Sequence, residues 1–140
     1  MAVVINFLPN TVGDMALSDF KVETQPSFTY KLDIDKNRIR GTTDGAEAML
    51  QTVYLILNTE RYQYPIYSRN YGVEFANLIG KSRDFVMSEL KRRITEALTQ
   101  DDRIESVDEW SFSHTYKSVV ASFVVHTIYG NVEIVKEVAV

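Results

Sequence analysis

The sequence predicts an α+β fold, in which two amphipathic helices pack on an antiparallel sheet with a long C-terminal β-hairpin. Two segments, 45–58 and 83–100, repeat apolar residues at helical spacing. Residues 119–140 instead form two β-branched runs on either side of a turn signal. The chain has 140 residues, a length that favours one folded domain.

An arm is expected over residues 1–26, in front of a domain that spans 27–140. Apolar residues gather at 3–8, and a polar stretch interrupted by Pro9 and Pro26 follows. An arm with an apolar tip either packs on its own domain or is held by a partner. The sequence leaves both possibilities open.

A β-hairpin is predicted directly after the arm. Four apolar residues alternate with polar ones at the period of a half-buried strand: Phe28, Tyr30, Leu32 and Ile34. Lys36 and Asn37 are typical of a turn. Residues 38–40 are expected to return as a short strand before Gly41.

Both helices carry start signals and an apolar stripe. Asp44 and Glu47 have the spacing of a capping box before the first helix, and Ser82 is expected to cap the second. The first stripe is interpreted as core: Ala46, Met49, Leu50, Val53, Tyr54 and Leu57. The second stripe is interpreted in the same way: Phe85, Val86, Leu90, Ile94, Ala97 and Leu98.

Residues 59–81, between the helices, are predicted to form a long structured loop. The segment contains four tyrosines and follows neither the helical nor the strand period. Loops of this length are usually functional or disordered, and the aromatic content argues against disorder. We therefore interpret the loop as an ordered contact surface.

The C-terminal third is the most strand-like part of the chain. An extended segment is expected from Ile104, with Trp110 and Phe112 on a strand, and Gly130–Asn131 is predicted as the two-residue turn of the hairpin. The first hairpin strand is apolar on both faces and is expected to be covered on both sides. The last strand is either an open edge for strand addition by a partner or covered within the monomer.

Composition excludes several classes of function. A net charge of −4 and a pI near 5.2 leave no basic footprint for nucleic acid. The absence of cysteine excludes disulfides, thiolate metal sites and a cysteine nucleophile. No apolar run approaches the ~20 residues that span a bilayer, and no leader pattern is evident, so we expect synthesis in the cytoplasm and no membrane partner.

The sequence contains few patterns that indicate catalysis or the binding of a metal or cofactor. His114 and His126 stand alone, so neither a metal nor a cofactor is expected, and no glycine-rich phosphate loop is present. A glycosidase needs only two carboxylates across a cleft. The spacing of the candidate carboxylates along the sequence does not require any two of them to lie close together: Glu47, Glu60, Glu74 and Asp84. The basic run 91–93 is interpreted as a solvated helix face, so an interaction protein is favoured over an enzyme.

Four segments carry a family resemblance: TYKLDIDKNRIRG at 29–41, the run from Ala48 to Lys81, ELKRRITEALTQDDRIESVDEWSF at 89–112, and VVHTIYGNVEIVKEV at 124–138. Their order resembles the XkdS-like tail proteins of contractile and defective phages and of phage-tail-like bacteriocins. That family is similar to the lysozyme-like baseplate wedge proteins of T-even phages, which act as sheath initiators. The resemblance implies a non-enzymatic structural component of the baseplate in a tail particle, assembled in the bacterial cytoplasm.

The resemblance also implies two sets of binding residues. A Glu-Pro-Arg motif that contacts the wedge core bundle falls by position on Asp101, Asp102 and Arg103, with Asp102 in place of the proline. The C-terminal β-structure of the family exchanges strands with the first sheath ring. In this chain that role falls on Val132, Glu133, Ile134, Val135, Lys136, Glu137, Val138, Ala139 and Val140.

The partners implied by the resemblance are therefore baseplate wedge proteins and the sheath protein, in a sixfold ring of copies. A second hypothesis is a tube or tail-completion adaptor, which would contact tube or hub proteins through residues 1–25. A peptidoglycan hydrolase that uses Glu47 or Glu60 is the third and weakest hypothesis.

Overall fold

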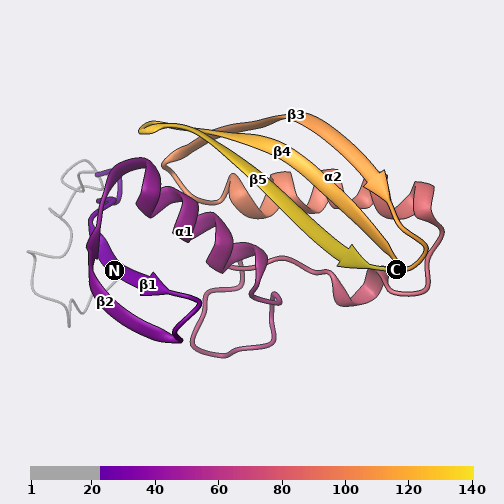
Figure 1. Ribbon diagram of the computed structural model, residues 1–140, viewed down its shortest axis with the longest axis horizontal. Helices are drawn as coiled ribbons and strands as arrows, with labels where there is room; N and C mark the ends of the chain where they lie inside the picture. Colours follow the sequence, from indigo (N-terminus) through magenta and orange to yellow (C-terminus); the bar gives the residue numbers. More distant parts are fainter. Residues whose placement is uncertain (1–22) are drawn as a thin grey trace, which may run out of the picture.

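The computed structural model describes residues 23–140 and has an α+β fold, as predicted (Figure 1). The arm expected over residues 1–26 lies mostly outside the described residues. In chain order the elements are β1 (Thr29–Asp33), β2 (Arg38–Thr43), α1 (Gly45–Leu57), the 3-10 turn η3 (Ala76–Leu78), α2 (Arg83–Leu98), β3 (Ile104–His114), β4 (Ser118–Thr127) and β5 (Gly130–Ala139). The last three strands form an antiparallel sheet in the order β3-β4-β5, and β1 pairs with β2 in a separate two-stranded sheet.

The core lies between α1, α2 and one face of the three-stranded sheet (Figure 1). Alternate residues of the central strand β4 point into this layer and are buried: Val119, Ala121, Phe123, Val125 and Thr127. The intervening residues Val120 and Val124 are half-buried on the outer face, which no helix covers within the described residues. Both helices lie on the same side, so within residues 23–140 only one of the two apolar faces of β4 has helical cover, and cover on the second face stays a prediction.

Helix α1 begins as predicted at Asp44, whose carboxylate accepts a hydrogen bond of 2.7 Å from the Gly45 amide. Glu47 pairs with Lys31 of β1. Within the predicted stripe, Met49, Val53 and Leu57 are buried.

The remaining members of the α1 stripe were misassigned to the core. Ala46 is exposed, Leu50 is 45% exposed and Tyr54 is 39% exposed. These three residues are four apart and follow one side of the helix, next to the side that meets α2 and the sheet. The helix is therefore apolar over more than its core-facing side, and the core covers only part of that surface.

In α2 the predicted stripe is buried except for Phe85, which is exposed. Ser82 occupies the predicted N-cap position, but its side chain makes no capping hydrogen bond. Asp84 lies in the first turn, where a carboxylate interacts favourably with the positive end of the helix dipole.

The β1–β2 hairpin is present, but of the four apolar residues predicted to be half-buried only Leu32 is. Phe28, Tyr30 and Ile34 are all largely exposed, because the hairpin stands apart from the main sheet. It is held on α1 by Gln51, which accepts a hydrogen bond of 2.8 Å from the Leu32 amide and donates one of 2.9 Å to the Tyr30 carbonyl. Strand β2 also continues through Gly41 to Thr43, beyond its predicted end.

The C-terminal hairpin is confirmed, but its turn lies two residues earlier than predicted. Thr127 pairs with Gly130, so the loop consists of Ile128 and Tyr129. Neither residue has a positive φ, which excludes the predicted type II′ turn. Gly130 itself has φ +125° and begins β5. Thr127 fixes the turn, since its hydroxyl donates to the Gly130 carbonyl and accepts from the Tyr129 amide.

The distinction between core and exposed helix faces predicts different costs for two matched substitutions. Leu90→Ala removes a fully buried side chain and should lower the free energy of unfolding by about 2–5 kcal/mol. Leu50→Ala removes a half-exposed side chain and should cost less than about 1 kcal/mol. Urea denaturation of both variants measures the difference, and equal costs would contradict the assignment of Leu50 to an exposed face.

Candidate functional site

Strand β5 lies at the edge of its sheet, and within residues 23–140 no strand pairs with its second side. Its pairing with β4 is regular from Ser118↔Ala139 to Thr127↔Gly130. An unpaired strand edge presents a row of amide and carbonyl groups to which another extended segment can bind. The edge is therefore the first candidate for a binding site.

The register identifies which backbone groups face outward. In an antiparallel ladder, residues alternate between those that bond to the neighbouring strand and those that turn away. The Val140 amide donates to the Lys117 carbonyl at 3.0 Å, so every second residue before it also bonds to β4. The backbone groups that turn toward the free edge are those of Asn131, Glu133, Val135, Glu137 and Ala139.

A groove of about 530 Å³ runs along this edge, between β5, α1 and the β1–β2 hairpin. Leu50 and Tyr54 of α1, together with Ile34 directly after β1, contribute apolar, partly exposed side chains to its lining. Figure 1 shows α1 between β5 and the hairpin, and we call three of its lining residues, Leu50, Gln51 and Tyr54, the floor of the groove. A segment added beside β5 would place alternate side chains on this floor.

The two lysines that line the groove have partners within the chain. Lys136 of β5 donates to the Asn58 side chain at 2.8 Å, and its Nζ lies 5.8 Å from the centre of the Phe75 ring. Burial lowers the pKa of Lys136. Lys31 is paired with Glu47. Because both lysines already have partners and α1 contributes Leu50 and Tyr54 to the lining, the groove favours apolar side chains on its α1 side.

The Asp101-Asp102-Arg103 segment lies in the turn between α2 and β3, beside the β4–β5 turn. The Ile128 amide donates to the Arg103 carbonyl at 3.1 Å. The Arg103 side chain is turned inward: the residue is 8% exposed, its Nε and Nη2 donate to Asp101 at 2.8 and 2.6 Å, and its Nη1 donates to the Pro26 carbonyl at 3.0 Å.

Asp102 is the exposed member of this segment, and its carboxylate accepts a hydrogen bond of 3.2 Å from the Gln25 amide. Although burial works to raise the pKa of the Asp101 carboxyl, hydrogen bonds from Arg103 hold it below its ordinary value. The segment thus ties residues 25–26 to the domain. It also fixes the point at which the chain enters from the arm.

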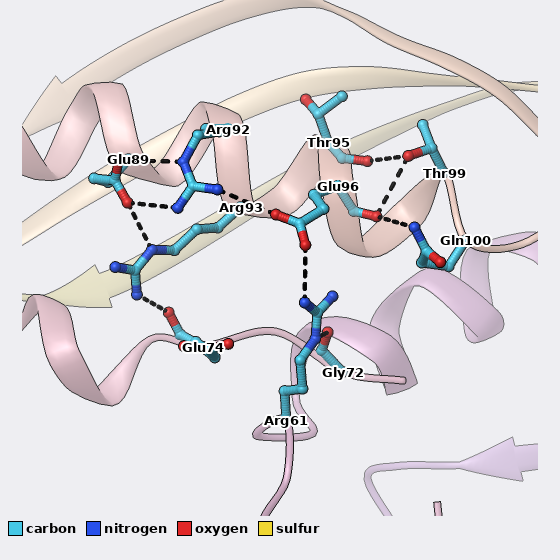
Figure 2. Close-up of polar contacts among 10 residues, drawn as sticks. All are labelled: Arg61, Gly72, Glu74, Glu89, Arg92, Arg93, Thr95, Glu96, Thr99 and Gln100. Atoms are coloured by element: carbon cyan, nitrogen blue, oxygen red, sulfur yellow. Dashed lines mark hydrogen bonds and ion pairs between the residues drawn. The ribbon is translucent and has the colours of Figure 1, made fainter. Parts of the chain in front are cut away.

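The loop between the helices is held on α2 by an ion pair and a hydrogen bond (Figure 2). Arg61 donates to Glu96 at 3.0 Å and to the Gly72 carbonyl, within the loop, at 3.2 Å. Arg93 donates to the Glu74 carbonyl at 2.7 Å. Three of the four tyrosines of the loop are exposed: Tyr62, Tyr64 and Tyr67. The predicted order of the loop is confirmed, and its role as a contact surface stays a prediction.

Three of the four candidate carboxylates, Glu47, Glu60 and Asp84, have structural roles. Glu47 pairs with Lys31, and Glu60 accepts hydrogen bonds from the Phe75 and Ala76 amides. Asp84 lies in the first turn of α2. Within residues 23–140, His, Asp and Glu form no cluster of three that could hold a metal ion. No helix in the same part of the chain is long and apolar enough to cross a membrane.

Comparison with known sequences decides the family. The profile of the contractile injection system sheath initiators matches residues 19–130, which is most of the chain. The chain belongs to the sheath initiator family. It is also 37% identical over 128 residues to the phage-like element PBSX protein XkdS of Bacillus subtilis (strain 168), a match that covers 86% of this chain and 91% of that protein. The resemblance read from the sequence motifs is confirmed.

The two predicted sets of binding residues differ in how accessible they are for a partner. Residues 132–140 follow one open edge, whereas Asp101 and Arg103 are engaged within the chain. The wedge and sheath roles of these residues stay predictions. Sequence reasoning missed Leu50 and Tyr54 as groove residues. The available signal was that α1 carries more apolar residues than one core-facing stripe needs.

The Glu89 cluster on α2 predicts a specific pH dependence of stability. Hydrogen bonds from Arg92 and Arg93 lower the pKa of Glu89 to about 2, from an ordinary value of 4.5. The folded chain therefore binds fewer protons between these values than the unfolded chain. The stabilisation that the ionised Glu89 gives to the folded chain is fully present above pH 4.5 and disappears as the pH falls toward 2.

Glu89→Gln should therefore lower the urea midpoint at pH 7, and the difference from the unsubstituted chain should shrink steadily below pH 4.5. Glu105→Gln, at an exposed position of β3, is the control and should change the midpoint little at any pH. A deficit in Glu89→Gln that is constant from pH 7 to pH 2 would contradict the ion-pair explanation.

Proposed function

We propose that this sheath initiator is a non-enzymatic baseplate component that docks on wedge proteins and starts the sheath by accepting a strand from the first sheath ring beside β5. The observation that carries the proposal is the free edge of β5 above an apolar groove. The family match ends at residue 130, where β5 begins. The assignment of the sheath contact to β5 therefore rests on geometry.

Strand addition explains how such an edge could start an ordered polymer. Main-chain hydrogen bonds fix the register of the added strand, and alternate side chains entering a groove select its sequence. The first sheath subunit would acquire a position and a direction from the same contact. Copies of the initiator in a sixfold ring would then set the positions of the first sheath ring, and the same exchange could repeat along the sheath.

The wedge contact is proposed in the turn that contains residues 101–103, which lies beside the turn that precedes β5. Asp102 offers an exposed carboxylate there, while the inward pair of Asp101 and Arg103 holds the turn rigid. A proline at position 102 would supply rigidity through the backbone. In this chain, the fork of hydrogen bonds between Arg103 and Asp101 supplies it instead.

A tube or tail-completion adaptor is the second candidate function. The observation that favours it is that the Gln25 and Pro26 backbone is fastened to the 101–103 turn, so the described part of the chain starts beside the proposed wedge contact. Binding of the arm to tube or hub proteins would then accompany wedge docking. Tails whose sheaths form normally after removal of residues 1–22 would limit the function to sheath initiation.

Blocking the β5 edge should prevent sheath assembly without unfolding the domain. Val135 is 71% exposed, and its amide turns away from β4. Val135→Pro removes that amide and places a ring in the path of an added strand, while strand edges tolerate proline at such positions. Tails assembled with this variant should carry sheath several-fold less often, as counted by electron microscopy.

His114→Pro is the matched control, because His114 lies on the opposite edge of the sheet. The Thr115 amide donates to the Ser118 carbonyl, so the His114 amide turns away from β4 in the same way. Circular dichroism should show both variants folded. Normal sheaths with Val135→Pro, or equal loss with both variants, would exclude β5 as the sheath-binding edge.

The wedge contact is tested by Asp102→Lys, which reverses an exposed charge and leaves the Asp101–Arg103 pair intact. Incorporation of the variant into baseplates should fall several-fold, while its urea midpoint changes little, since surface substitutions usually alter stability by less than about 0.5 kcal/mol. Asp108→Lys, at an exposed position of β3, controls for the change in net charge. Full incorporation of Asp102→Lys would exclude the proposed wedge contact.

A further inference from the structure

The free edge of β5 carries two acidic side chains at a fixed spacing. Glu133 and Glu137 are exposed and lie two residues on either side of Val135. All three point to the outer face of the sheet, because burial alternates along β5 and the residues between them, Ile134 and Lys136, are half-buried on the inner face. The edge formed by residues 133–137 borders the groove. In residues 23–140, no lysine or arginine forms an ion pair with either glutamate; Glu137 accepts a hydrogen bond from the Ser118 hydroxyl.

The outer face beside these residues adds more negative charge. The register places Asp108, Val124 and Glu133 in one row across the three strands. A strand that extends the sheet beyond β5 would therefore place its outward side chains next to Glu133 and Glu137. Directly opposed residues on neighbouring strands lie about 4.5–5.5 Å apart, where like charges repel and opposite charges attract.

The same spacing disfavours pairing between two copies of this chain. An antiparallel pair that uses all of the outward positions from Asn131 to Ala139 is centred on Val135. Each Glu133 then faces Glu137 of the other copy, so the interface contains two like-charge pairs. Shifting the register moves Glu133 away from Glu137 of the other copy, but the pair then loses main-chain hydrogen bonds at the ends of the two β5 strands. The edge is thus protected from self-association while its backbone groups stay available.

We propose that the β5 edge selects an extended segment with a defined alternation: lysine or arginine at two outward positions, opposite Glu133 and Glu137, and apolar residues at the positions that face the groove. This inference rests on the proposed strand addition and names the chemistry of the partner. The negative charges of Glu133 and Glu137 select basic residues at the outward positions of the added segment. The partly exposed Leu50 and Tyr54 on the floor, together with the internal pairing of Lys31 and Lys136, set the inward ones.

Two synthetic peptides test the selectivity on the full chain. The first is Thr-Val-Lys-Val-Thr-Val-Lys-Val-Thr, which reads the same in both directions and therefore tests parallel and antiparallel addition together. The second carries glutamate at both lysine positions. Fluorescence anisotropy at low salt, where screening is weak, should show that the lysine peptide binds about tenfold more tightly than the glutamate peptide.

Charge reversal of the edge should exchange this preference. The double variant Glu133→Lys/Glu137→Lys should bind the glutamate peptide more tightly. The control Glu105→Lys/Glu109→Lys, at exposed positions of β3, carries the same change in net charge and should keep the original preference. If the unsubstituted chain binds both peptides equally, the selectivity is wrong while strand addition stands. If neither peptide binds, the edge is not a docking site, and both proposals are overturned.

Self-association gives an independent measurement. The single variant Glu133→Lys converts both like-charge pairs of the full-length register into opposite-charge pairs, so sedimentation velocity should show more dimer than for the unsubstituted chain. The double variant restores repulsion and should return to monomer. An unsubstituted chain that dimerises, with Val135→Pro abolishing the dimer, would overturn the inferred protection against self-pairing.

Discussion

The burial of one face of β4 against the two helices is the interaction on which the rest of the structure depends. Every second residue of this strand, from Val119 to Thr127, is buried, while both of its edges are paired. A central strand fixed in this way determines where β3 and β5 can lie. Because both helices lie on the same side, the outer face and the second edge of β5 are left uncovered within residues 23–140.

Helix α1 contributes both to the core and to a surface groove. Met49 and Val53 are buried in the core, whereas Leu50 and Tyr54, each one position further along the chain, line the groove. The hairpin β1–β2, held by Gln51, forms the far wall of that groove. A small domain can thus offer an apolar binding surface without removing side chains from its core.

The sequence predicted the helices, the C-terminal hairpin and the family because periodicity, turn residues and motif order depend on local sequence. It could not assign Leu50 and Tyr54 correctly, since a helix that is apolar on two sides has the same pattern whether the second side is buried or exposed. Phe28 and Tyr30 alternate like residues of a half-buried strand, but their exposure depends on the hairpin standing apart from the sheet. Arg103 was identified by position, and only the fold shows that it is engaged by Asp101 and Pro26.

The unbroken register between β4 and β5 has a mechanical consequence. Ten residue pairs join the two strands without a bulge, from Ser118↔Ala139 to Thr127↔Gly130. A force directed along β5 is therefore shared by the whole ladder at once, whereas a force that peels the strand from one end would break its hydrogen bonds in succession. Strand β4 passes the load to β3, whose first residue, Ile104, directly follows Arg103. The domain thus offers a continuous path for force from its open edge to the turn that holds Gln25 and Pro26.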